Sequence, residues 1–92
     1  MENIRAHLIV EGRVQGVWYR DSTRQKALEL GLKGWVKNRI DGNVEIVAEG
    51  TDHLVAELKN WCYEGPPNAV VTNVKETIEE YTGEFLSFDI VF

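Results

Sequence analysis

The fold of this chain is most constrained by the order in which two kinds of hydrophobic spacing follow one another. In residues 4–11 every second side chain is apolar, which predicts a strand with one buried face. Thr23, Ala27 and Leu30 then fall at positions i, i+4 and i+7, which predicts a first helix that stops at Gly31. The chain therefore begins with a strand that is followed by a helix.

A hairpin and a second helix come next. Residues 33–40 and 43–49 predict two short strands on either side of Asp41-Gly42, a pair typical of hairpin turns. Behind a Thr51 N-cap, the helical spacing returns at Leu54, Leu58 and Trp61, and this second helix ends at Gly65-Pro66-Pro67.

Residues 69–78 and 86–92 predict the last strands, with a bulge between Val71 and Val74, which are out of phase with each other. The order is thus βαββαβ with a short extra C-terminal strand. Because only one face of each strand is consistently apolar, both helices must cover the same face of one antiparallel sheet. We expect a single domain over residues 1–92, an α+β sandwich with a ferredoxin-like fold.

The loop between the first strand and the first helix contains Gly12 and Gly16 and ends in Arg20, where the helix begins. Glycine accepts positive φ angles, so consecutive backbone N–H groups can turn toward one point, to which the helix adds its positive end. A guanidinium there matches two phosphate oxygens. The spacing predicts an anion site, although an ordinary strand-to-helix turn with a surface arginine explains the same residues equally well.

Two longer motifs carry a family resemblance. Val10-x-Gly12-x-Val14-Gln15-Gly16-Val17-x-Tyr19-Arg20 resembles the first signature of the acylphosphatase family, and Gly34-Trp35-Val36-Lys37-Asn38-x-x-x-Gly42-x-Val44, closing with Gly50, resembles the second. One departure is Tyr19, where the family usually has Phe or Met, and this departure concerns local packing. The resemblance covers the whole chain and implies the same ferredoxin-like fold.

The resemblance also implies roles for individual residues. Asn38 is expected to position an attacking water, and Arg20 to act in both binding and catalysis. The phosphate-binding residues are expected to be Gln15, Gly16, Val17, Trp18, Tyr19 and Arg20. Whether Gln15 and Trp18 line the loop or pack under it is left open by the sequence.

The chemistry that the loop lacks points to the same substrate class. It contains no nucleophile, no histidine base and no Walker lysine, so the site offers positioning and positive charge. An acyl phosphate suits such a site, because its carboxylate leaving group has a conjugate acid of pKa about 4 and needs no general acid. We expect hydrolysis to a carboxylate and inorganic phosphate by metal-independent in-line water attack, with no cofactor and no metal site.

The composition limits the classes of partner that we expect for this chain. Ten Lys and Arg against fifteen Asp and Glu give a net charge of −5, which argues against nucleic acid or an anionic membrane as a partner. We expect a small-molecule acyl phosphate as substrate, phosphate or sulfate as competing anions, and a monomer. The single Cys62, the lack of a leader and the lack of a long apolar run favour the cytoplasm.

Two alternatives remain at this point. The same loop could hold a phosphoanion such as carbamoyl phosphate in a non-catalytic binding module. An RNA-recognition module on the same fold would need a basic surface and paired aromatic residues on the exposed strand face, which the first strand does not offer.

Overall fold

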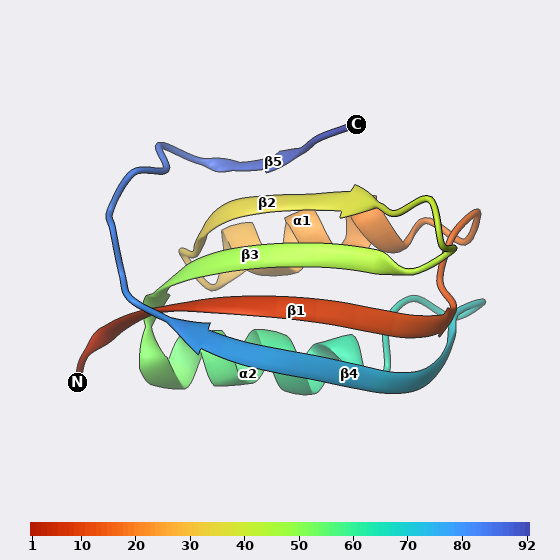
Figure 1. Cartoon of the computed structure of the whole chain (residues 1–92), viewed down its shortest axis with the longest axis horizontal. Helices are drawn as coiled ribbons and strands as arrows, with labels where there is room; N and C mark the ends of the chain where they lie inside the picture. The colour runs from red at the N-terminus through yellow and green to blue at the C-terminus, as the bar shows by residue number, and fades with distance from the viewer.

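The computed structural model describes all of residues 1–92 and contains seven elements in the predicted order (Figure 1). They are β1 (Asn3–Arg13), α1 (Tyr19–Glu29), β2 (Lys33–Asn38), β3 (Val44–Thr51), α2 (Asp52–Cys62), β4 (Val70–Glu79) and β5 (Phe88–Ile90). The predicted ferredoxin-like fold with a short extra strand is confirmed. The second predicted strand is shorter than expected, because it ends at Asn38 and leaves Ile40 exposed in the hairpin.

The strands lie in the order β4-β1-β3-β2-β5. The first four pair in antiparallel fashion, as predicted, but β5 pairs in parallel with β2, so the sheet is mixed rather than wholly antiparallel. The direction of β5 follows from its connection, which leaves the end of β4 and crosses the end of the sheet to the opposite edge (Figure 1). A strand that starts from that end must run against β4, and it therefore runs with β2.

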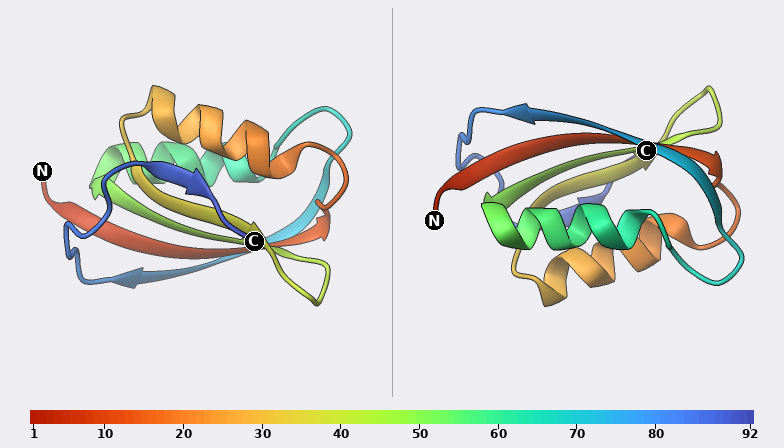
Figure 2. Two further views of the ribbon diagram at one scale, coloured as in Figure 1. Left: turned by 90° about the horizontal axis from the view of Figure 1, so that it is seen from above. Right: turned by 90° about the horizontal axis from the view of Figure 1, so that it is seen from below.

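Both helices cover one face of the sheet, as expected (Figure 2). Helix α1 packs on β2 and β5, whereas α2 packs on β1 and β3. The buried face of α2 consists of Val55, Leu58 and Cys62. Leu58 is buried as predicted, whereas Leu54 and Trp61 pack at the border and their following neighbours take the buried positions. No helix is long and apolar enough to span a bilayer.

The predicted bulge in the last long strand is confirmed. Glu11 pairs with Asn73 and Gly12 with Val71, which leaves Thr72 without a partner. Gly12 has φ 127, and a Cβ at this position would collide with the backbone of β4. The bulge lies beside the point where β1 ends and the glycine-containing loop begins.

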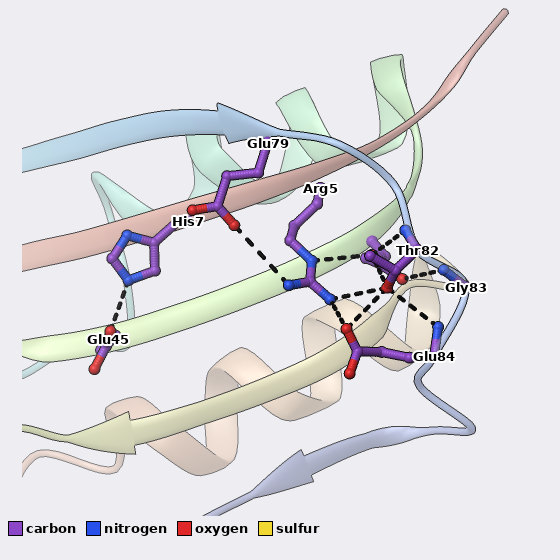
Figure 3. A network of polar contacts seen from close by, with 8 residues as sticks. Arg5, His7, Glu45, Glu79, Thr82, Gly83 and Glu84 are labelled. Carbon is purple, nitrogen blue, oxygen red and sulfur yellow. Dashed lines mark hydrogen bonds and ion pairs between the residues drawn. The ribbon is translucent and has the colours of Figure 1, made fainter.

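A polar network at the other end of β1 fixes the connection between β4 and β5 (Figure 3). The buried carboxylate of Glu49 accepts a hydrogen bond from Arg5 Nε at 3.0 Å. It also accepts bonds from the backbone N–H groups of Thr82 and Gly83 at 2.9 and 3.1 Å. Arg5 pairs in addition with Glu84. The network holds the segment that leads to β5 and hence to the residues that follow it.

Candidate active site

The loop after β1, the end of β2 and the residues from the end of β5 onward enclose a cavity of about 530 Å³. Its lining comprises Val14, Gly16, Trp18, Tyr19, Arg20, Asp21, Asn38, Ile90 and Phe92. The structure thus brings Arg20 and Asn38, which come from different elements, to one cavity. Among the expected phosphate-binding residues, Gln15 and Val17 are not part of the lining.

The backbone of the loop turns twice through the left-handed region before the helix begins. Gly16 has φ 75, and Trp18, the N-cap of α1, has φ 67 and ψ 22. The hydrogen bond from Ser22 N to Trp18 O, at 3.1 Å, opens the helix, so the N–H groups of residues 19–21 have no intrahelical acceptor. No side chain caps them. Free N–H groups at the positive end of a helix suit an anion.

Arg20 places an unpaired positive charge beside these N–H groups. Its side chain is half-buried and forms no ion pair with any carboxylate. The guanidinium lies over one aromatic ring, that of Phe92, whose centroid is 5.2 Å from Arg20 Cζ. The N–H donors of the guanidinium are therefore available to a ligand.

Asn38, the last residue of β2, lines the same cavity and carries an unsatisfied acceptor. Its Oδ1 is the one buried side-chain polar atom in the chain without a hydrogen-bond partner. Leaving such an atom unpaired costs about 1–3 kcal/mol, so its position calls for a donor from outside the chain. The side chain follows the buried Val36 on the face under the helices, as its strand parity predicts. An O–H group of water can supply the missing donor.

Gln15 and Val17 contribute to the shape of the loop. Gln15 Nε2 donates to the carbonyl oxygens of Arg39 and Asn43, at 2.8 and 2.9 Å, and so ties the loop to the hairpin that follows Asn38. Val17 is buried in the core. For a bound anion, these two residues offer their backbones only. Trp18, in contrast, is 76% exposed at the cavity, which settles the question that the sequence left open.

Tyr19, which stands where the family usually has Phe or Met, is buried and hydrogen-bonded. Its hydroxyl donates to the carbonyl oxygen of Cys62 at 2.7 Å, and its ring centroid lies 5.6 Å from that of Trp61. Burial strongly raises the pKa of the Tyr19 hydroxyl. Burial likewise raises the pKa of the Cys62 thiol to about 12, so the thiol stays neutral and packs, as predicted. The hydrogen bond from Tyr19 to Cys62 and the ring contact with Trp61 thus join the start of α1 to the end of α2.

The sequence reasoning did not identify Val14, Asp21, Ile90 or Phe92 as lining residues. The alternation of Phe88, Ile90 and Phe92 was a usable signal, because such spacing gives a strand one apolar face. What local spacing does not reveal is that β5 lies beside β2, which is a property of the topology.

The two histidines lie outside the cavity. His7 Nε2 is 2.6 Å from Glu45 Oε2, and His53 is exposed beside Asp52. No group of three or more His, Cys, Asp or Glu side chains is arranged to hold a metal ion.

The family model, the similar sequences and the similar solved structures that match this chain include acylphosphatases. The family model described as Acylphosphatase matches residues 6–90. An acylphosphatase of Pelotomaculum thermopropionicum is 51% identical over 92 residues, which is 100% of both chains. The crystal structure of the Bacillus subtilis acylphosphatase has a TM-score of 0.93 and 37% identity, covering 97% of this chain and 99% of that one. Full-length HypF, in a phosphate- and nucleotide-bound form, has a TM-score of 0.89 and 26% identity, covering 99% of this chain but 12% of HypF.

Proposed function

Since this chain belongs to the acylphosphatase family and is an enzyme that hydrolyses acyl phosphates, we propose that the reaction takes place in the cavity that Arg20 and Asn38 share. One observation carries this proposal. The cavity is lined both by a guanidinium without a carboxylate partner and by Asn38, which carries the single unpaired buried side-chain acceptor of the chain. The first suits the phosphoryl group, and the second suits a water molecule.

Arg20 and the loop backbone bind the phosphoryl group. The free N–H groups at the start of α1 and the two left-handed turns at Gly16 and Trp18 provide donors around one point. Arg20 contributes two further donors and a full charge. In a loose phosphoryl-transfer transition state, this arrangement neutralises charge on the equatorial oxygens without moving any group.

Asn38 positions the nucleophile. A water that donates one hydrogen to Asn38 Oδ1 is held with an oxygen lone pair free to point at phosphorus. Its oxygen forms the new P–O bond as the bond from phosphorus to the acyl oxygen breaks. The electron pair of that bond leaves with the carboxylate.

The protons of this step need no protein base. One hydrogen of the water stays on the attacking oxygen, and the other passes to a phosphoryl oxygen of the substrate. The products are therefore a carboxylate and dihydrogen phosphate. The leaving carboxylate is a weak base, so it departs without general acid help.

The experiment that tests this proposal compares leaving groups. Without a general acid, the enzyme forgoes about 10²- to 10⁴-fold on substrates that must expel an alkoxide. We expect kcat/KM to fall from benzoyl phosphate to 4-nitrophenyl phosphate to glycerol phosphate, in the order of leaving-group pKa. Near-equal values for the three would show that an acid in the site protonates the leaving group.

The reaction is proposed to need no metal and no other cofactor, and this is tested separately. Phosphate release from benzoyl phosphate should persist after treatment with EDTA and after blocking of thiols. A loss in EDTA that a divalent cation restores would contradict the proposal. Inorganic phosphate and sulfate should inhibit competitively, because they occupy the site of the phosphoryl group.

We further propose that the protein works as a cytoplasmic monomer without nucleic acid or membrane partners, in keeping with its net charge of −5. A non-catalytic module that binds carbamoyl phosphate is the less favoured alternative. Tight binding of carbamoyl phosphate without release of inorganic phosphate from any acyl phosphate would favour that alternative.

A further inference from the structure

Two aromatic side chains stand exposed at the rim of the catalytic cavity. Trp18 is 76% exposed and Phe92 is 100% exposed, and both belong to the lining. The other exposed aromatic residues, Tyr63 and Tyr81, are 51% and 43% exposed and lie outside it. The two most exposed rings of the molecule therefore share one cavity. Exposed apolar surface gathered at a cavity is typical of ligand contact.

The backbone of Trp18 adds a second observation. Trp18 is the one residue other than glycine with positive φ, a conformation that is rare for a bulky side chain. It makes no side-chain capping bond to α1, and its ring is not part of the core. Folding alone therefore gives no reason for a tryptophan at this strained position. Strain of this kind is commonly found at functional sites.

Phe92 places the other ring next to the proposed phosphoryl site. Its centroid is 5.2 Å from Arg20 Cζ, and Phe92 also borders the neighbouring groove beside Asn38. In an acyl phosphate the acyl group is bonded directly to the phosphoryl group. A substrate held by Arg20 therefore carries its acyl group into the volume next to this ring.

The charges of the lining limit what kind of acyl group fits. Arg20 is the single cation, and it is used by the phosphoryl group. Asp21 is the single carboxylate side chain, and every other side chain of the lining is neutral. The neighbouring groove beside Asn38 adds Lys37 and Arg39, but both already pair with carboxylates of the same groove. A second negative group on the substrate would thus meet apolar surface and carboxylates, with no unpaired cation to balance it.

We propose, on the basis of the active site assigned above, that Trp18 and Phe92 bind the acyl group and determine substrate specificity. The enzyme then prefers acyl phosphates with an uncharged, apolar, ring-containing acyl group. It discriminates against acyl groups that are small and against those that carry a carboxylate. The cavity of about 530 Å³ has room for such a group beside the phosphoryl group.

The test compares kcat/KM for benzoyl, acetyl and succinyl phosphate in the unaltered enzyme and in Trp18→Ala and Phe92→Ala. Each variant is compared with the unaltered enzyme on the same substrate, so the intrinsic reactivity of the substrates cancels. We expect each variant to lose about 3- to 10-fold on benzoyl phosphate, the range for one aromatic contact, and less than about 2-fold on the other two. Trp18→Phe, which keeps a ring, should retain most of the preference.

A matched control is Ile78→Ala, which removes an exposed apolar side chain from β4, at the other edge of the sheet. It should leave all three values within about 2-fold, the range of an uninvolved surface site. Inhibition by inorganic phosphate reports whether the phosphoryl site is intact, and it should be unchanged in every variant.

Two results would overturn the proposal. One is an unchanged preference in both ring variants. The other is an equal loss on all three substrates with weaker inhibition by phosphate, because Phe92 would then act by holding Arg20 and not by contacting the acyl group. A failure of the proposed active site would look different, since Arg20→Gln would then leave phosphate release from all three substrates unchanged.

Discussion

Two arginines at opposite ends of the sheet have opposite surroundings. Arg5, near the start of β1, is surrounded by the carboxylates of Glu49, Glu79 and Glu84 (Figure 3). Arg20, beyond the other end of β1, has no carboxylate partner and shares its cavity with Asn38, whose side-chain oxygen is unpaired. The polar groups around Arg5 pair with one another, whereas the Arg20 guanidinium and the Asn38 oxygen have no such partners within the chain.

The difference separates stability from catalysis. A charge that is already paired in the folded state is unavailable to a ligand, and removal of its partner destabilises the fold. An unpaired guanidinium and an unpaired amide oxygen cost folding free energy, and they recover it when a ligand binds. Substitutions at the two ends should therefore affect different measurements, and each prediction below tests that separation.

The largest effect is expected for Arg20→Gln, which removes the charge of the open end. The kcat/KM for benzoyl phosphate should fall by at least about 10³-fold, the scale for a charge that stabilises a phosphoryl-transfer transition state. Inhibition by phosphate should be lost, and the Tm should stay the same or rise slightly. Arg24→Gln, on the same helix and also half-buried, should change activity by less than about 2-fold. A large fall in Tm for Arg20→Gln would show that this arginine is structural.

Asn38→Ala should lower kcat by about 10²- to 10³-fold, the effect of removing one positioned polar group. Phosphate inhibition should remain nearly unchanged, because the side chain holds water and not the phosphoryl group. Stability should not fall, since the substitution deletes an unpaired buried acceptor. If phosphate binding weakened as much as turnover, Asn38 would be a substrate contact. Asn60→Ala, at an exposed position of α2, serves as the control.

Glu49→Gln should lower stability and leave kcat nearly unchanged, which is the reverse of the effects expected for Arg20→Gln and Asn38→Ala. Removing one partner of a buried ion pair costs about 3–5 kcal/mol, and we expect a loss near the lower end because Arg5 keeps Glu84 as a partner. Urea unfolding measures this loss. The kcat of the folded fraction should stay within about 2-fold, since the network lies far from the cavity. A selective loss of kcat at full stability would contradict the separation of the two ends.

The same network predicts how stability depends on pH. Burial acts to raise the pKa of Glu49, but hydrogen bonds from the Thr82 backbone, Arg5 and the Thr82 hydroxyl outweigh it and lower the pKa below its ordinary 4.5. The bond from Arg5 lowers the pKa of Glu84 in the same way. Because both carboxyls have depressed pKa values in the folded state, their stabilisation is complete above pH 4.5 and is lost as the pH falls below it. Unfolding curves of Glu49→Gln should show a shallower decline in this range.

The smallest effect is expected for Tyr19→Phe, which restores the residue usual in the family. The loss of its hydroxyl leaves the carbonyl of Cys62 without this donor and should cost about 1 kcal/mol of unfolding free energy. The ring still packs beside Trp61, so kcat/KM should change by less than about 2-fold. A marked fall in activity would mean that the bond between the two helices also sets the geometry of the loop.

The fold was largely predictable because each element has its own local pattern. The alternation in β1, the helical spacing in α1, and the phase change between Val71 and Val74 each gave the observed structure. The parallel pairing of β5 was not predicted, since its direction depends on where β4 ends. Likewise, two of the three predicted positions of the buried face of α2 are replaced by their following neighbours, because tertiary packing buries Val55 rather than Leu54.

The candidate site was predictable where a motif carried it and not elsewhere. Arg20 and Asn38 stood out from their motifs, and the structure places both at one cavity. The roles of Gln15 and Tyr19 depended on partners distant in sequence, namely the hairpin carbonyls and Cys62. Phe92 reaches the cavity because β5 lies beside β2, and no local signal carries that pairing.

The exposed position of Trp18 also makes the cavity optically accessible. Trp35 and Trp61 are half-buried, so their emission reports mainly on folding, whereas the indole of Trp18 stands in solvent beside Arg20. A protein carrying Trp35→Phe and Trp61→Phe would have its fluorescence from Trp18 alone. A ligand that covers this ring would shift the emission to shorter wavelength. The strained residue at the start of α1 thus provides a built-in spectroscopic probe, which reports acyl-group contact without the need for turnover.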